Sequence, residues 1–303
     1  MFYQEIPVQV KGSLPGAKLT LYIQDYSADM LVQERPMIII CPGGGYEHLS
    51  VREGESMALQ FMAMGLHAAV LRYSVAPAAY PVQLTELAYA MKYIREHVKE
   101  WHIQENKIIV HGSSAGGHLA ASLGVFWKEE CLYKSVGAES AEEIRPDGML
   151  LSYPVITSGE FAHRGSFDKL LGKGNESADE LVESTSTDGI KEGVLSAKNG
   201  ADEETLKEEA LLEKLSLEKQ VNADTPPAFI WHTFEDGTVP MENSLFFVSA
   251  LRKFHIPTEF HLYPKGQHGL ALGTELTASA GGKHMQVECA SWIVLAKTWI
   301  ENL

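Results

Sequence analysis

The segment KIIVHGSSAGGHLAASLGVF, residues 107–126, joins a β-branched apolar run to an Ala/Leu-rich tail through a glycine-rich turn. The run IIV is typical of a buried parallel strand, and the tail is typical of a helix. The turn contains a G-x-S-x-G motif centred on Ser114, because Ser113 has His111 and Ala115 where glycines would be needed. A strand, this motif and a helix in that order predict a nucleophile elbow.

The chemistry of such an elbow explains its spacing. The serine at the apex has a strained backbone, and only glycine-sized neighbours let the strand and the helix pass so closely. The turn also directs the N–H of Ala115 and the positive end of the helix towards an oxyanion on a bound acyl group. In a chain with 26 glycines the motif alone is weak evidence. It predicts catalysis only if an oxyanion loop, an acid and a histidine occur at the expected places.

The composition is that of an ordinary soluble globular protein, since 45% of the 303 residues are hydrophobic and 21% are charged. The formal net charge of -15 argues against nucleic acid and anionic membrane surfaces as partners, because both require basic patches. No apolar run reaches the roughly 18 residues that a transmembrane helix requires. The sequence leaves the oligomeric state open, a homo-oligomer included.

Cysteine usage and the N-terminus bear on the cellular compartment. Cys41, Cys131 and Cys289 are odd in number, widely spaced and without a C-x-x-C motif, which favours a reduced intracellular protein over a disulfide scaffold. The first residues, MFYQEIPVQVKG, lack the charged and apolar regions of a signal peptide. We therefore expect a cytoplasmic protein.

The order of elements predicts the fold class. Residues 1–36 alternate around turn formers and predict two strands that pair antiparallel at a sheet edge. Apolar runs then alternate with helical periodicity, which predicts right-handed winding of a mostly parallel sheet. We expect one doubly wound α/β domain over residues 1–303, with a polar break at 128–145. The expected strands are 37–41, 67–73, 108–110, 147–156, 226–233 and 258–263, and the expected helices are 55–64, 81–98, the segment after Ser114, 243–254 and 284–303.

The stretch 172–220 differs from the rest of the chain. It is rich in Glu, Lys, Ser, Asp and Asn, with few large apolar residues before Leu211. It lies before the last two strands and is expected to be an insertion, a cap segment or a surface loop, with a charged helix over 205–219. Its charges favour a solvated face over a partner site. Whether it serves as a lid, a dimer contact or only a loop stays open.

Three consecutive glycines follow the strand MIIIC and precede Tyr46. Glycine lets the backbone approach a substrate more closely than a Cβ would allow, which favours an oxyanion loop over a flexible turn. A phosphate cradle is the rival, but no Gly-Lys-Ser/Thr follows, and His48 stands where a dinucleotide fingerprint requires glycine. We expect Gly44 and Gly45, together with Ala115, to form the oxyanion hole.

The acid of a nucleophile–base–acid arrangement should lie on the loop after a late strand. Asp236 does so, directly after FIWHT in the segment HTFEDGTVP. A surface Asp-Gly turn would look the same. Glu235 is the first alternative, and Asp224 is weaker because it precedes the strand.

The base should be a histidine on the loop after the last strand. Of 12 histidines, His268 fits best, because it follows the strand TEFHLY and lies between Gly266 and Gly269. His261 lies within that strand and His284 at a predicted helix start, so both are weaker. No H-E-x-x-H motif or clustered Cys/His spacing occurs, and we expect neither a metal nor a cofactor.

With these residues in place, the sequence resembles the α/β-hydrolases, which carry the order Ser…Asp…His. More narrowly, it resembles bacterial esterases related to acetyl xylan esterases and hormone-sensitive-lipase-like enzymes. Pro42 stands where that family often has histidine. The sequence therefore does not decide which N–H groups of the loop face the substrate. The motifs that carry the resemblance are CPGGGY (41–46), GSSAGGHL (112–119), LSYPVI (151–156), WHTFEDGTVP (231–240) and KGQHGL (265–270).

The resemblance implies a serine carboxylesterase for short acyl esters, with acetyl groups on sugars or oligosaccharides as candidate substrates. His268 would take the Ser114 proton and Asp236 would hold the imidazole tautomer, so activity should rise as His268 loses its own proton. A peptidase of the prolyl-oligopeptidase type shares G-x-S-x-G-G but usually carries a large extra domain. A non-catalytic binding protein of the same fold would normally have lost one of the three residues.

Overall fold

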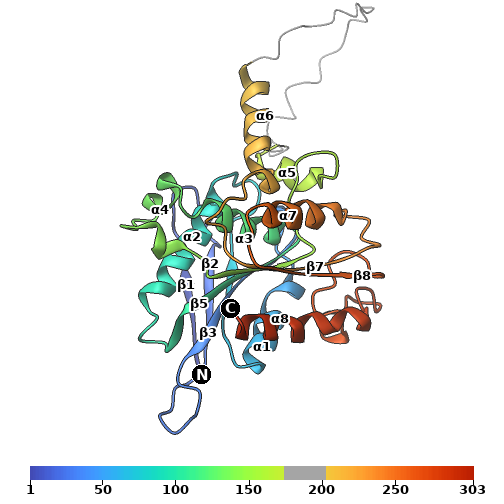
Figure 1. Cartoon of the computed structure of the whole chain (residues 1–303). Coiled ribbons are helices and arrows are strands. Elements are labelled where there is room, and N and C mark those ends of the chain that lie inside the picture. Colours follow the sequence, from blue (N-terminus) through green and yellow to red (C-terminus); the bar gives the residue numbers. More distant parts are fainter. Residues whose placement is uncertain (174–202) are drawn as a thin grey trace, which may run out of the picture.

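An eight-stranded sheet runs through the computed structural model, which describes residues 1–173 and 203–303 (Figure 1). The strands follow one another across the sheet in the order β1-β2-β4-β3-β5-β6-β7-β8. Their bounds are β1 Phe2–Pro7, β2 Lys18–Ile23, β3 Arg35–Cys41, β4 His67–Arg72, β5 Ile103–Ser113, β6 Gly148–Ser152, β7 Ala228–Thr233 and β8 Thr258–Tyr263.

The directions of the strands confirm the expected fold class. β1 pairs antiparallel with β2, and β2 pairs antiparallel with β4. Every other pair of neighbours, from β4 across to β8, is parallel. β3 and β5 lie side by side in the middle, where paired residues such as Ile38 and Ile109 have no exposed surface. Burial on both faces explains why these strands read as continuous apolar runs.

Helices cover both faces of the sheet (Figure 1). Apolar side chains of α2, α3 and α7 pack into one core cluster, and those of α1 and α8 pack into a second. The two clusters make the three-layer arrangement of a doubly wound α/β fold. The helices of the described residues are α1 Glu55–Ala63, α2 Val82–Glu96, α3 Ala115–Phe126, α4 Glu130–Ser135, α5 Arg164–Leu170, α6 Glu203–Leu215, α7 Glu242–Lys253 and α8 Trp292–Glu301.

Several elements differ from the sequence prediction, and the helix α5 is one that the sequence analysis did not predict. The expected polar break contains the short helix α4, whose Leu132 is buried among apolar neighbours. The expected strand over 147–156 ends at Ser152, because Tyr153 has a φ of +37° and Pro154 follows. The last helix begins at Trp292 instead of 284, since His284 has a φ of +65° and Val287–Ser291 form a 3-10 helix before it.

The predicted stretch 172–220 is described only in part, since residues 174–202 lie outside the described residues. Its described remainder contains α6, which begins two residues before the expected helix and ends four residues before the expected end. Leu215, at the end of α6, is fully buried, and its carbonyl lies 2.9 Å from His118 Nε2 of α3. The end of α6 is therefore attached to the core. Among the described residues, no helix combines the length and the apolar character that a bilayer span requires.

Candidate active site

Ser114 lies in a sharp turn between β5 and α3, with a φ of +55° and a ψ of -121°. Two glycines permit this turn. A Cβ on Gly112 would lie 2.0 Å from the carbonyl oxygen of Gly116, and a Cβ on Gly116 would lie 2.0 Å from that of Cys41. Only residues without a Cβ let the strand, the helix and the loop after β3 come this close. The geometry is that of the predicted nucleophile elbow.

Ser114, His268 and Asp236 form one continuous chain of hydrogen bonds. Ser114 Oγ lies 2.7 Å from His268 Nε2, and His268 Nδ1 lies 2.6 Å from Asp236 Oδ2. Asp236 follows β7 and His268 follows β8, so both loops leave the carboxyl edge of the sheet, where the elbow also lies. The structure thus brings together the three residues that the sequence singled out.

Asp236 is almost fully buried, and its environment keeps it ionised. Its Oδ1 accepts hydrogen bonds from the N–H groups of Thr238 and Val239, each at 2.9 Å. His232 Nε2 lies 3.3 Å from Oδ2, beside the bond from His268. Burial alone raises the pKa of Asp236, but the hydrogen bonds from His232 and His268 outweigh it and hold the pKa well below its ordinary value.

The weaker candidates take no part in this chain. Glu235 and Asp224 are exposed, and Asp224 forms an ion pair with Lys128. His261 contacts Glu259 at 2.7 Å on β8, and the Nδ1 of His284 lies 3.0 Å from a serine hydroxyl. Of these candidates, Asp236 and His268 are the two that hydrogen bonds link to Ser114 in the described part of the chain.

The glycine loop lies directly against the nucleophile elbow. A Cβ on Gly43 would lie 3.0 Å from the Cβ of Ser114 and 2.8 Å from the carbonyl oxygen of Ser113. The N–H of Gly43 already donates to Glu53 Oε2 at 3.0 Å. Gly43 is therefore next to Ser114, but its N–H is not free for a substrate.

The N–H groups of the neighbouring residues remain for a ligand. Within residues 1–173 and 203–303, no hydrogen bond engages the backbone N–H of Gly44, Gly45 or Ala115. Gly44 has a φ of +125° and Gly45 a φ of +66°, a left-handed path that favours glycine. These three residues are the ones that the sequence predicted for an oxyanion hole.

Aromatic and histidine side chains surround His268. The Tyr153 ring meets the His268 ring edge to face, with 5.1 Å between ring centres. Burial, and then the nearby His268, lower the pKa of His163. Burial, and then the Arg52 charge, lower the pKa of His284. In both histidines the neutral imidazole is therefore favoured over the charged form.

Sequence reasoning missed three residues of this region: Glu53, Tyr153 and His232. Glu53 lies in VREGES, which carries no motif, and it reaches the site only through the fold. Tyr153 lies within the quoted LSYPVI motif, but nothing in the sequence indicated a partner. His232 precedes Asp236 by four residues, and this spacing in WHTFED is the one signal that could have drawn attention to it.

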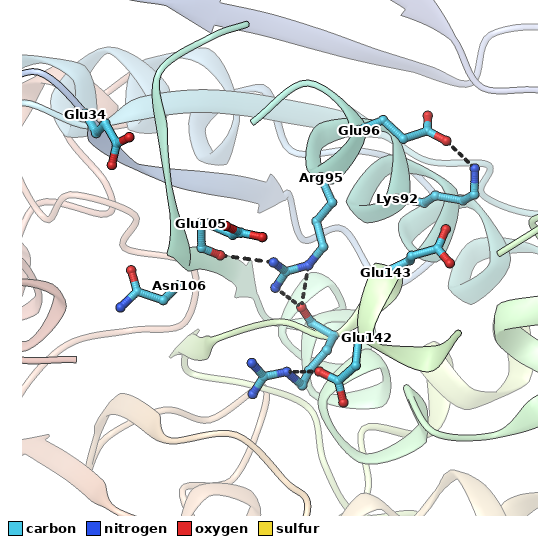
Figure 2. Close-up of a pocket in the computed structure, with 9 residues that line it drawn as sticks. Glu34, Lys92, Arg95, Glu96, Glu105, Asn106, Glu142 and Glu143 are labelled. Atoms are coloured by element: carbon cyan, nitrogen blue, oxygen red, sulfur yellow. Dashed lines mark hydrogen bonds and ion pairs between the residues drawn. The ribbon is translucent and has the colours of Figure 1, made fainter. Parts of the chain in front are cut away.

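A large cavity of about 670 Å³ lies elsewhere (Figure 2). It opens near the amino end of β5, whereas Ser114 follows the carboxyl end of that strand. Its charged side chains largely pair with one another or with backbone, as Arg95 does with the carbonyl of Arg145 (Figure 2). Ligands of open α/β sheets bind at the carboxyl ends of strands, so the region of Ser114 is the stronger candidate site. The lining residues are Glu34, Lys92, Arg95, Glu96, Glu105, Asn106, Glu142, Glu143 and Arg145.

The family of the chain follows from its similarity to known proteins. A family model described as BD-FAE matches residues 24–251, which is most of the chain. The chain belongs to the BD-FAE family. This BD-FAE family member is 34% identical over 258 residues to an endo-1,4-beta-xylanase B of Butyrivibrio fibrisolvens, covering 83% of this chain and 35% of that protein. It is 27% identical over 267 residues to an acetylxylan esterase of Xylanibacter ruminicola, covering 85% of this chain and 47% of that protein.

The BD-FAE family member is also similar to a solved structure. Its sequence is 33% identical to that of an acetyl ester-xyloside bifunctional hydrolase from Caldicellulosiruptor lactoaceticus, whose crystal structure superposes with a TM-score of 0.72. The match covers 94% of this chain and 88% of that one. The expected resemblance to α/β-hydrolase esterases of the acetyl xylan esterase type is thereby confirmed. The chain spans less than half the length of the two curated relatives.

Proposed function

We propose that this BD-FAE family member is a serine carboxylesterase that hydrolyses short acyl esters through an acyl-enzyme on Ser114. The observation that carries the proposal is the hydrogen-bond chain from Asp236 through His268 to Ser114, at 2.6 Å and 2.7 Å. Nucleophile, base and orienting acid in contact are the arrangement that activates a serine hydroxyl.

The direction of proton transfer follows from Asp236. A carboxylate can only accept hydrogen bonds, and the pKa of Asp236 is held low, so His268 Nδ1 must be the donor. The neutral imidazole then has a free lone pair on Nε2, which faces Ser114 Oγ. As Oγ attacks the ester carbonyl carbon, its proton passes to Nε2, and the imidazolium next protonates the leaving alcohol.

The carbonyl oxygen of the ester becomes negatively charged in this step and needs hydrogen-bond donors. In the described part of the chain, the N–H groups of Gly44, Gly45 and Ala115 have no protein acceptor, and the N-terminus of α3 adds a partial positive charge. We assign the oxyanion hole to these three residues. A water molecule, activated by His268, then cleaves the acyl-enzyme and restores Ser114.

Acetylated sugars are the substrates that we propose. Support comes from two relatives, one named an acetylxylan esterase and one an acetyl ester-xyloside bifunctional hydrolase. We further propose a reducing, cytoplasmic location, which the three free cysteines Cys41, Cys131 and Cys289 support. For the segment 172–220 we propose an insertion within one α/β-hydrolase domain.

Hydrolysis of p-nitrophenyl acetate and p-nitrophenyl butyrate tests the proposed function. We expect turnover by the wild type and a loss of at least about 10³-fold in kcat for Ser114→Ala, since the nucleophile is removed. Ser122→Ala is the matched control, because Ser122 is a buried serine of α3 whose hydroxyl donates to a backbone carbonyl within that helix. It should keep the wild-type kcat.

The outcomes separate the alternative functions. A preference for acetate over butyrate leads next to acetylated xylo-oligosaccharides, where release of acetate is measured. Unchanged turnover by Ser114→Ala would contradict the proposal. Cleavage of proline-containing peptides without any ester turnover would favour a peptidase, and a wild type inactive on both would favour a binding protein.

A further inference from the structure

The peptide unit between Pro42 and Gly43 is held at both ends by buried side chains. Tyr73 donates its O–H to the carbonyl oxygen of Pro42 at 2.6 Å. The N–H of the same peptide unit, on Gly43, donates to Glu53 Oε2 at 3.0 Å. These two bonds fix the first peptide plane of the loop. The next two peptide units are held from within the loop, since the carbonyl oxygen of Gly43 accepts the N–H of Ser50 at 2.9 Å and that of Gly44 accepts the N–H groups of Glu47 and His48 at 3.1 Å.

Hydrogen bonds of Glu53 also connect the glycine loop to the loop that carries His268. Its other oxygen, Oε1, accepts the O–H of Tyr153 at 2.6 Å. The oxygen of Tyr153 in turn accepts the N–H of Ala271 at 2.9 Å, three residues after His268. One carboxyl group thus connects the glycine loop, the segment after β6 and the loop that carries His268.

The neighbour of Glu53 contacts the same loop. Arg52 donates to the carbonyl oxygens of Gly269 and Thr277, at 2.9 Å and 3.0 Å. Both residues belong to the short helix Val51–Glu53, which lies between β3 and α1. This turn therefore reaches the His268 loop in two ways, directly through Arg52 and from Glu53 by way of Tyr153.

Glu53 is buried, with 2% of its surface exposed. A buried acidic side chain is unfavourable unless its oxygens accept hydrogen bonds, and both oxygens of Glu53 do so. Burial, and then the Glu53 charge, raise the pKa of Tyr153 well above its ordinary value, so Tyr153 stays a donor.

We propose that Glu53 is a positioning residue that holds the glycine loop and the His268 loop in register. Through Gly43 it fixes the peptide unit from which the Gly44 and Gly45 N–H groups continue, and through Tyr153 it holds the His268 loop at the distance that the Ser114 contact needs. This inference rests on the proposed esterase function. Glu53 touches neither Ser114 Oγ nor the imidazole in a hydrogen bond, so it acts through the two loops.

The consequence is a specific kinetic signature. Substrate binding depends on the pocket, whereas the oxyanion forms only as the transition state is approached. Misdirected N–H groups therefore lower kcat and leave KM nearly unchanged. A loss of one oxyanion donor costs about 10²–10³-fold in kcat, and a misplaced donor costs less.

The test compares kcat and KM for p-nitrophenyl acetate in four variants, with active sites counted by an organophosphonate. Glu53→Ala removes both hydrogen bonds, and we expect kcat to fall about 100-fold. Glu53→Gln can still accept the N–H of Gly43 but leaves the Tyr153 hydroxyl without an acceptor, so we expect kcat to fall about 10-fold. Tyr153→Phe breaks only the link to Ala271 and should also cost about 10-fold.

Asp147→Asn is the matched control. Asp147 is a buried carboxyl group that precedes β6 and accepts the N–H of Ile108 at 2.9 Å, and neither residue belongs to the glycine loop or the His268 loop. Its substitution tests the loss of a buried carboxylate without touching the two loops. We expect the melting temperature to fall, while kcat per active site stays at the wild-type value.

Each outcome decides between the alternatives. Wild-type kcat per active site in Glu53→Ala and Tyr153→Phe would overturn the positioning role, as would a change confined to KM. If Glu53→Ala does not fold, Glu53→Gln and Tyr153→Phe carry the same test. A wild type without ester turnover would contradict the proposed function itself, which distinguishes that failure from an active wild type whose Glu53 variants are equally active.

Discussion

Burial and hydrogen bonding have opposite effects on the pKa of Asp236. Burial favours the neutral acid, whereas two backbone N–H groups and the side chains of His232 and His268 favour the carboxylate. The second group of effects is larger, so the pKa of Asp236 is lowered. An ionised Asp236 requires His268 to carry its proton on Nδ1, which leaves Nε2 for Ser114. The tautomer of His268 therefore depends on the whole shell around Asp236.

Asp236→Asn tests this dependence through catalysis. Asparagine has the same shape, but its amide can donate to Nδ1 and stabilise the wrong tautomer of His268. We expect kcat for p-nitrophenyl acetate to fall about 10²–10⁴-fold. Glu235→Gln removes the exposed acid next to it and should leave kcat unchanged. An equal loss in both variants would contradict the assignment of Asp236.

Asp236 also predicts how stability changes with pH. Its pKa in the folded protein lies below the ordinary value of 3.8, so its contribution is complete above pH 4 and is lost as pH falls through the folded value. We expect the free energy of unfolding of the wild type to exceed that of Asp236→Asn by about 1–3 kcal/mol at pH 7, with a smaller difference near pH 3. Urea denaturation at both pH values measures this, and a constant difference would contradict it.

Among the elements, the elbow between β5 and α3 is the most constrained. Its glycines allow α3 to approach the loop after β3, and this approach brings the glycine loop to Ser114. The core strands could be predicted from the sequence because each is a continuous apolar run that burial on both faces requires. The start of α8 could not, because His284 has a φ of +65° and Val287–Ser291 form a 3-10 helix, and neither feature shows in the apolar pattern of the segment.

Gly116→Ala tests the close approach at the elbow. The new Cβ would lie 2.0 Å from the carbonyl oxygen of Cys41, so α3 must move away from the loop. We expect a destabilisation of about 1–3 kcal/mol and a clear loss of esterase activity. Gly16→Ala is the control, because no atom lies within 4 Å of its added Cβ. Thermal unfolding and turnover that match in the two variants would contradict the argument.

For the whole molecule, topology explains which site residues could be predicted. Ser114, Asp236 and His268 each follow a parallel strand, and the carboxyl ends of such strands meet at one edge, so their position in the chain was informative. Glu53 accepts a hydrogen bond from Tyr153, which lies 100 residues later in the chain, and no local sequence pattern encodes such a contact. Its partners become visible only when the loops are folded together.

The direct test of the central claim is covalent labelling of Ser114. The wild type is incubated with an organophosphonate, and the intact mass and the peptide map are compared with those of Ser114→Ala. We expect one adduct per chain, on the peptide that contains Ser114, and none in the variant. An adduct on another residue, or equal labelling of both proteins, would contradict the assignment of Ser114 as the nucleophile.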